Sequence, residues 1–337
     1  NESMSSADSF SSFSRAHEFF VGIDSDGCVF DSMELKHKEC FCPAFVDRFE
    51  LQAASRYARE VWEFVNLYSS TRGVNRFQAV IRALELCRSR AEIAERGVSV
   101  PRLPALEQWV ESERKLGNPQ LESRVASAPH PDLERALAWS KQVNDAVAKI
   151  VRNVPPFPGV RKVLETLQPH ADVVVVSQTP ADALCREWAE QELDAYVALI
   201  AGQELGTKSD HLRATAGAAG HADAVGTAGP GDEHAGAIPP AGPGHEHAGA
   251  IPSAGPAAYP TDHVLMIGDA PGDRAAARET GALFYPILPG REEESWQRLV
   301  QEGLDRFFAK RYAGDYERAL LEEFDSVLPA APPWRKR

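Results

Sequence analysis

The sequence lacks the features that mark disulfide-stabilised, membrane-spanning and nucleic-acid-binding proteins. Its 337 residues include five scattered cysteines and no CxxC pair. Such a set is typical of reduced thiols, so we expect a cytoplasmic protein. The longest aliphatic run, residues 173–176, is far too short to cross a bilayer, so we expect no membrane partner. The formal net charge of -13 argues against a nucleic-acid partner, although a local basic pocket would still suit an anionic small molecule.

Two segments have little of the apolar content that folding requires. Residues 1–16 are rich in serine, without the basic start and apolar core of a signal peptide, and are predicted to be a disordered leader. Residues 214–260 consist mainly of Ala, Gly, Pro and His and contain the tandem repeat GPGDEHAGAIPPA–GPGHEHAGAIPSA. Without large apolar side chains to offset chain entropy, this segment is predicted to be a disordered surface loop.

The remaining sequence alternates short apolar runs with helical patterns. Apolar runs at 19–23, 172–176, 263–267 and 283–287 are nearly continuous, as in strands covered on both faces. Strands that alternate with helices in this way predict an α/β fold with a Rossmann-like doubly wound parallel sheet.

A long helical insertion follows the first of these strands. Residues 44–68 and 132–151 each place apolar side chains on one helical face, and the turn-rich VPPFPG at 154–159 ends the stretch. We therefore expect an α/β core made of residues 17–31 and 156–337, with an all-helical block at 32–155. The repeat at 214–260 would be a loop within that core.

Four groups of polar residues lie where predicted strands end. Asp24 and Asp26 follow the first strand, Ser177 the second, and Asp269 the third, with Asp273 four residues later. Thr179, two residues after Ser177, is expected to cap the next helix. Lys208 follows the short apolar run at 195–201. Because the carboxyl ends of parallel strands meet at one edge of the sheet, we expect these side chains to converge.

This combination of side chains suits a phosphate ester bound with a metal ion. In an extended chain Asp24 and Asp26 face the same way, and two ionised carboxylates there repel unless a cation joins them. Asp269 would add a third carboxylate. Mg2+ prefers such oxygen ligands, while Lys208 and the Ser177 hydroxyl suit phosphate oxygens. The sequence therefore predicts a Mg2+-phosphate site.

These residues, in this order, resemble the haloacid dehalogenase superfamily, in particular its phosphatase and phosphomutase branch. The resemblance covers roughly residues 17–33, 157–213 and 261–292. Its first motif is similar to Asp24-Ser25-Asp26-Gly27-Cys28-Val29, with cysteine where threonine or valine is usual, and the Asp-Ser pair at 31–32 is also similar. The resemblance implies an α/β core with an inserted helical cap at 32–155, and phosphoric monoester hydrolysis.

The resemblance also implies a role for each core residue. Asp24 would be the nucleophile that forms an aspartyl-phosphate, and Asp26 the general acid and base. Mg2+ would be held by Asp24, by Asp26 through its backbone carbonyl, and by Asp269. Ser177 and Lys208 would complete the catalytic set, in which Asp273 positions Lys208 or a metal-bound water. The cap is longer than in the compact phosphoglucomutase-like members, so the substrate contacts of those proteins cannot be transferred to this sequence.

Within the cap, the segment TRGVNR at 71–76 contains candidate substrate-binding residues. Arg72 and Arg76 are four apart and are expected to share a helical face, and Asn75 adds an amide. Lys36, His37 and Lys38 follow soon after the first motif and are further candidates to face the pocket. The alternative for all of these residues is a solvated surface.

The predicted function is a Mg2+-dependent phosphatase acting on a small phosphorylated metabolite. A β-phosphoglucomutase-like phosphomutase is the nearest alternative, because it would use the same residues. A regulatory or binding module on an inactive fold is disfavoured by the intact set of core residues. Dehalogenase and phosphonate-hydrolase activities are disfavoured by Asp26, since those branches lack an aspartate at this position.

Overall fold

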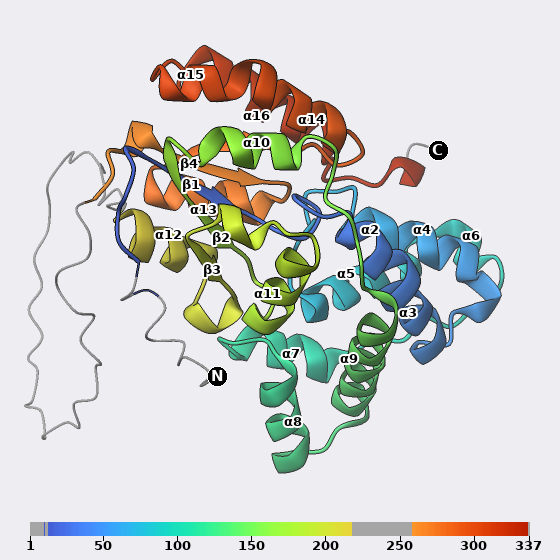
Figure 1. The fold of residues 1–337 in the computed structure, drawn as a ribbon. Helices are drawn as coiled ribbons and strands as arrows, with labels where there is room; N and C mark the ends of the chain where they lie inside the picture. The colour runs from blue at the N-terminus through green and yellow to red at the C-terminus, as the bar shows by residue number, and fades with distance from the viewer. Residues whose placement is uncertain (1–9, 11–12, 218–257, 336–337) are drawn as a thin grey trace, which may run out of the picture.

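The computed structural model describes residues 10, 13–217 and 258–335, which fold around a five-stranded parallel sheet (Figure 1). The strand order is β3-β2-β1-β4-β5. The strands are β1 (Phe19–Ile23), β2 (Ala171–Val176), β3 (Leu199–Ala201), β4 (Val264–Gly268) and β5 (Leu283–Pro286). The parallel, doubly wound sheet predicted from the sequence is confirmed.

The centre of the sheet is β1, which pairs with β2 on one side and β4 on the other. Ile23, its last residue, lies opposite Val175 and Ile267. The chain order runs outward in one direction from β1 to β3 and in the other from β4 to β5, so the topology switches between β1 and β4. In open α/β sheets, ligands bind at the carboxyl ends of the strands beside such a switch point.

Both faces of the sheet are covered, which explains the nearly continuous apolar strands. Alternate residues point to opposite faces: Val21, Ile23 and Ile267 pack into one core, whereas Phe20, Val176 and Met266 pack into the other. The core helices are α10 (Val160–Leu167), α11 (Ala181–Glu190), α12 (Lys208–Ala216), α13 (Pro271–Thr280), α14 (Glu292–Arg298), α15 (Leu304–Phe308) and α16 (Asp315–Val327).

The described residues between β1 and α10 are helices and turns with a core of their own. The helices are α2 (Ser32–Leu35), the π-helical Lys36–Phe41, α3 (Cys42–Arg48), α4 (Ser55–Asn66), α5 (Arg76–Arg88), α6 (Ala91–Ala94), α7 (Pro104–Ser112), α8 (Asn118–Ser127) and α9 (Pro131–Ile150). Trp62 and Trp139 are fully buried in this core. The long helix expected at 132–151 is confirmed as α9. The segment 44–68 is instead split between α3 and α4, because Glu50 turns the chain at a left-handed φ of 59°.

The two low-complexity segments lie mostly outside the described residues. Of the predicted leader 1–16, residues 1–9 and 11–12 are not described, while Phe13 is buried edge-on against Phe20. Of the predicted loop 214–260, residues 218–257 are not described. Its start needs correction, because α12 continues through Ala216 with Thr215 buried. At its end, Tyr259 is buried and its hydroxyl donates to Asp172.

The C-terminal segment returns from the sheet to the helical block (Figure 1). After α16, the Pro329 carbonyl accepts a hydrogen bond from Ser70 N at 3.3 Å. The Trp334 ring then packs edge-on against Phe64, with centroids 5.4 Å apart, and the Arg90 guanidinium lies 4.5 Å above it. These contacts attach the C-terminal segment of the core to the inserted helices.

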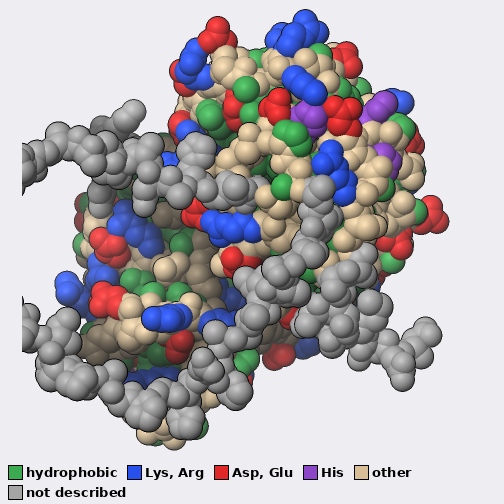
Figure 2. Space-filling view, turned by 90° about the vertical axis from the view of Figure 1, so that its left-hand side faces the viewer, with side chains coloured by type: hydrophobic (Ala, Val, Ile, Leu, Met, Phe, Trp, Pro, Cys, Tyr) green, Lys and Arg blue, Asp and Glu red, His purple; other side chains and the backbone are tan. Residues whose placement is uncertain are grey.

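Charged side chains of both signs are interspersed over the face shown in Figure 2, apart from the grey atoms. In the part of the chain that the structure describes, no helix combines the length and the apolar character needed to cross a membrane.

Candidate active site

Asp24 and Lys208 meet at the carboxyl edge of the sheet. Asp24 directly follows β1, and its backbone N donates to Ile267 O of β4 at 3.0 Å, which places its side chain at the switch point. The side chain of Lys208 reaches it from the first turn of α12, with Nζ 2.8 Å from Asp24 Oδ2. A capping box between Thr207 and Asp210 fixes the start of that helix. The structure thus brings together residues that the sequence keeps far apart.

Asp273 completes a buried chain of charges with Lys208. It lies in the first turn of α13, where its Oδ2 accepts a hydrogen bond from Ala270 N and its Oδ1 lies 2.5 Å from Lys208 Nζ. A Cβ at Gly268 would lie 2.4 Å from the Asp273 carboxylate carbon, so the glycine allows this close approach. Asp273 thus contacts Lys208 directly, and its role in positioning Lys208 or a metal-bound water stays a prediction.

Asp269, which follows β4, bonds to the helical block as well as facing the core cluster. Its Oδ2 accepts from Arg72 Nε at 2.7 Å and lies 2.6 Å from Arg72 Nη2. Its Oδ1 is buried and has no hydrogen-bond partner among the described residues. The oxygen atoms of Asp24, Asp269 and Asp273 that face one another all lie within 4.8 Å.

These three carboxylates fit a divalent cation by charge and by their unsatisfied oxygen. Lys208 and Arg72 supply two positive charges against three carboxylates, which leaves an unbalanced negative charge in a buried site. Burial, only partly offset by these cations, raises the pKa of Asp24 to about 7 and that of Asp269 to about 6. A bound cation would favour the ionised forms of Asp24 and Asp269, and Mg2+ prefers carboxylate oxygens as ligands.

The Asp26 carboxylate lies apart from that group and has partners of its own. Lys36 Nζ and Ser32 Oγ donate to Oδ1, and Thr179 Oγ1 donates to Oδ2 at 2.8 Å. Burial works to raise the pKa of Asp26, but Lys36, together with these hydroxyls, outweighs it and lowers the pKa to about 2. The side chain of Asp26 is therefore not one of the three grouped carboxylates, and only its backbone carbonyl stays a predicted metal ligand.

Ser177 directly follows β2 at the same edge of the sheet and is 2% exposed. Its backbone N donates to Ala201 O of β3, and its Oγ accepts from Thr179 N at 3.2 Å. Among the described residues, neither contact joins Ser177 directly to Asp24. Its hydroxyl occupies the neighbouring strand end, where the sequence placed it.

Thr179 and Glu187, near Asp26, add to the set predicted from the sequence, in which Lys36 was already a candidate. Thr179 was expected to cap the next helix, but α11 begins at Ala181 with Pro180 as its N-cap, and the Thr179 hydroxyl turns to Asp26 instead. Lys36 contacts Asp26 and lies 3.9 Å from Glu187 of α11. Burial raises the pKa of Glu187 to about 7. The only sequence signal for the contact between Thr179 and Asp26 was a threonine two residues after Ser177.

The expectation that Arg72 and Arg76 share a helical face is wrong. Asn75 is the N-cap of α5, where its Oδ1 accepts from Phe77 N, so Arg72 lies in the preceding turn and only Arg76 is helical. Arg72 reaches Asp269. The Arg76 guanidinium points into the helical block, where it donates to Ser140 Oγ at 3.0 Å.

His37 is packed in the helical block. Its Nδ1 accepts from Trp62 Nε1 at 3.3 Å, and its ring stacks on Phe41 with centroids 4.7 Å apart. Burial, aided by the nearby Arg72, lowers the pKa of His37 to about 3, so the imidazole is neutral at physiological pH. Its preceding residue, Lys36, is the one that faces the core.

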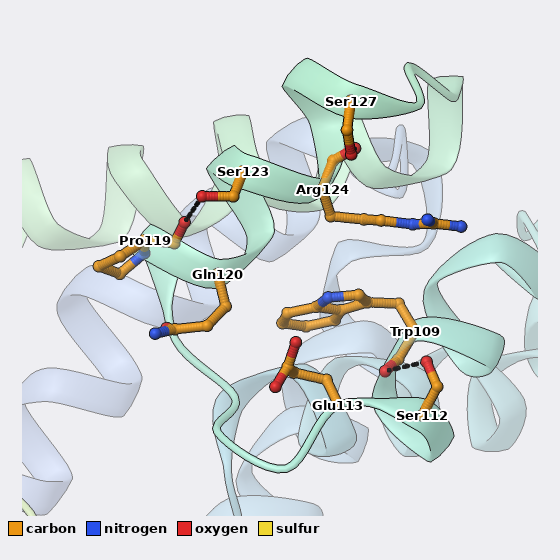
Figure 3. Close-up of a pocket in the computed structure, with 8 residues that line it drawn as sticks. All are labelled: Trp109, Ser112, Glu113, Pro119, Gln120, Ser123, Arg124 and Ser127. Carbon is orange, nitrogen blue, oxygen red and sulfur yellow. Dashed lines mark hydrogen bonds between the residues drawn. The ribbon is translucent and has the colours of Figure 1, made fainter. Parts of the chain in front are cut away.

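A separate cavity of about 470 Å³ lies between α7 and α8 in the helical block (Figure 3). The Trp109 indole lies between Arg124 and Glu113 there, and its Nε1 has no hydrogen-bond partner among the described residues. The predicted site residues do not line this cavity. The candidate active site at the strand ends is thus separate from this cavity.

The fold and site together define a doubly wound α/β protein with a helical insertion and a buried aspartate–lysine cluster at its switch point. No protein-family model matches the chain, and no curated protein matches it. Among solved structures, a predicted phosphoglycolate phosphatase from Haemophilus somnus is similar, with 13% identity over 81% of this chain and 86% of that chain and a TM-score of 0.41.

Two further structures are similar over most of their length. One is a haloacid dehalogenase-superfamily hydrolase from Geobacter sulfurreducens, with 14% identity, covering 81% of this chain and 89% of that chain, and a TM-score of 0.34. The other is a haloacid dehalogenase-like hydrolase from Streptococcus pneumoniae, with 15% identity, 86% and 98% coverage and a TM-score of 0.39. At these identities and TM-scores, the function of this chain is inferred from its own residues.

Proposed function

We propose that the protein is a Mg2+-dependent phosphatase that hydrolyses a small phosphorylated metabolite through an aspartyl-phosphate. The observation that carries this proposal is that two aspartates of one loop have different side-chain partners. Asp24 lies beside Lys208 in a group of three carboxylates, whereas Asp26 is held apart by Lys36, Ser32 and Thr179. A nucleophile and a proton carrier need such different surroundings.

In the first half-reaction, an Asp24 carboxylate oxygen attacks the phosphorus atom and the bond from phosphorus to the ester oxygen breaks. Asp26 donates its proton to that departing oxygen. Lys208 would neutralise Asp24 as it approaches an anion, and the Ser177 hydroxyl would donate to a phosphate oxygen. When bound by Asp24, Asp269 and the Asp26 carbonyl, Mg2+ would supply charge neutralisation for the transferring phosphoryl group.

In the second half-reaction, Asp26 accepts a proton from water as the water oxygen attacks phosphorus. The bond from phosphorus to Asp24 then breaks, which frees the carboxylate and inorganic phosphate. The low pKa of Asp26 keeps it ionised and ready for this step. The first step instead requires a protonated Asp26, so the Lys36 contact must weaken before a poor leaving group departs.

The experiment that tests this proposal measures inorganic phosphate released from p-nitrophenyl phosphate. We expect release that requires Mg2+ and stops in EDTA, and a fall of at least about 1,000-fold in Asp24→Asn. Asp305→Asn, a change of the same chemistry at an exposed residue of α15, is the matched control. Full activity in EDTA or in Asp24→Asn would contradict the proposal.

A phosphomutase is the second candidate that the same residues allow. It would retain a bisphosphate intermediate where a phosphatase admits water. A panel of phosphorylated metabolites, assayed for both phosphate release and isomerised product, separates the two activities and narrows the substrate class. A regulatory module on an inactive fold would bind such ligands without either product.

A further inference from the structure

Arg72 is the one cation that the helical block contributes directly to the three grouped carboxylates in the described structure. It is 3% exposed and lies in the turn before α5. Its Nη1 donates to Leu67 O at 2.9 Å, and its Nε and Nη2 both reach Asp269 Oδ2. The guanidinium is thus fixed at one end to the block and at the other to a predicted metal ligand of the core.

The contact leaves half of Asp269 unused. Both short contacts from Arg72 go to Oδ2, while Oδ1 is buried without a hydrogen-bond partner among the described residues. A buried carboxylate oxygen without a partner is costly, so its presence indicates a place for a ligand. Arg72 therefore neutralises Asp269 without closing the carboxylate group to a cation.

The backbone of the first motif is shaped around this pair. Gly27 adopts a φ of +77°, and a Cβ there would lie 2.6 Å from Arg72 Nη2 and 2.7 Å from Asp269 Oδ2. Only a residue without a side chain allows the ion pair to lie against this loop. Arg72 is therefore built into the site rather than resting on its surface.

The charges of the site determine how Arg72 affects the binding of a cation and of a phosphate group. With Lys208 and Arg72 in place, the three carboxylates have one unbalanced negative charge. A divalent cation alone would turn this into a buried positive excess. A divalent cation together with a doubly charged phosphate would restore a small negative charge, which the site already tolerates. Without Arg72, the cation alone would balance the site.

We propose that Arg72 is a resident counter-cation of the site: it opposes binding of Mg2+ alone and favours binding of Mg2+ together with a phosphate group. This inference rests on the proposed function, because it takes the same carboxylates as metal ligands. Arg72 acts through Asp269 and is a positioning residue. Its consequence is that metal and phosphate bind as a pair, so the site stays poorly metallated until an anionic substrate arrives.

Isothermal titration calorimetry of the full chain tests this inference, with Mg2+ alone and then with inorganic phosphate at saturating Mg2+. We expect Arg72→Gln to bind Mg2+ alone about 10-fold more tightly than the wild type and phosphate about 10-fold more weakly, a shift of ~1.4 kcal/mol in each case. Arg72→Lys, which keeps the charge, should stay close to the wild type in Mg2+ affinity. Arg72→Met replaces the Gln variant if the latter does not fold.

The outcomes separate this inference from the proposed function. Equal Mg2+ affinity in the wild type and Arg72→Gln, or weaker binding in the variant, would overturn the role of Arg72 and leave the phosphatase intact. Failure of both proteins to bind Mg2+ at millimolar concentration would instead contradict the metal site itself. Looser Mg2+ binding in Arg72→Lys than in Arg72→Gln supports repulsion by the charge.

Discussion

Asp24 and Asp26 follow the same strand, β1, yet their carboxylates have opposite surroundings. Burial raises the pKa of Asp24 to about 7, whereas Lys36 and two hydroxyls overcome burial and lower the pKa of Asp26 to about 2. The two like charges avoid each other because each has its own cation, Lys208 for Asp24 and Lys36 for Asp26. This separation underlies the predictions that follow.

Asp24→Asn should stabilise the metal-free protein while it destroys activity. Because the folded-state pKa of Asp24 is raised, its ionisation costs stability. That cost is absent below the ordinary pKa of 3.8, grows as pH rises and is complete above about 7. Removing the charge should therefore raise stability by up to about 4 kcal/mol at pH 8. The gain should fade toward pH 4.

Urea unfolding in EDTA, at pH 8 and at pH 4.5, measures this difference. The Asn variant leaves Lys208 paired with Asp273, so a buried unpaired lysine does not complicate the comparison. Adding Mg2+ should stabilise the wild type more than the variant. A variant that is less stable than the wild type at pH 8 without metal would contradict the predicted charge imbalance.

Asp26→Asn should affect substrates according to their leaving groups. An alkyl phosphate needs a proton on its departing oxygen, whereas p-nitrophenolate leaves without one. We expect kcat/KM to fall about 1,000-fold for the alkyl ester and considerably less for the nitrophenyl ester. Steady-state kinetics on the two esters provide the measurement, and equal losses would show that Asp26 is not the proton donor.

Ser177→Ala should slow the reaction without unfolding the protein. Ser177 follows β2, and within the described part of the chain its hydroxyl accepts a hydrogen bond only from the Thr179 backbone N, so its loss removes few structural bonds. If it donates to the transferring phosphoryl group, kcat should fall by about 100-fold with an unchanged melting temperature. Ser177→Thr, which keeps a hydroxyl, is the paired variant and should retain more activity than alanine does.

Trp334→Ala should loosen the attachment of the helical block to the core. The indole packs on Phe64 and Arg90 of that block at the end of a segment that starts from α16. Losing this half-buried ring should cost about 1–2 kcal/mol of stability. Hydrogen exchange of α4 and α5 should quicken more than that of β1 and β4. Uniform exchange changes across the chain would contradict a local tie.

The sequence was informative wherever one local pattern determined the structure. Apolar runs that precede Asp24, Ser177 and Asp269 predicted both the sheet and the edge of it on which these residues lie. The strand ends are fixed by burial and topology, which short-range patterns record well. The long helix α9 was predicted for the same reason.

Contacts between distant segments were beyond such patterns. Four-residue spacing suggested that Arg72 and Arg76 share a face, but Asn75 caps the helix between them and sends Arg72 to Asp269. Similarly, Thr179 was predicted to cap a helix, but its hydroxyl donates to Asp26, because a buried carboxylate competes strongly for a hydroxyl donor. Partners of this kind depend on how the block packs on the core, which spacing does not encode.

The most direct test of the central claim is to locate the covalent phosphoryl group. Protein turning over p-nitrophenyl phosphate with Mg2+ is quenched with borohydride, which reduces an aspartyl-phosphate to homoserine, and its peptides are analysed by mass spectrometry. We predict that the residue at position 24 is converted, and only when substrate and Mg2+ are both present. Conversion of another carboxylate, or none at all while phosphate is released, would contradict Asp24 as the nucleophile.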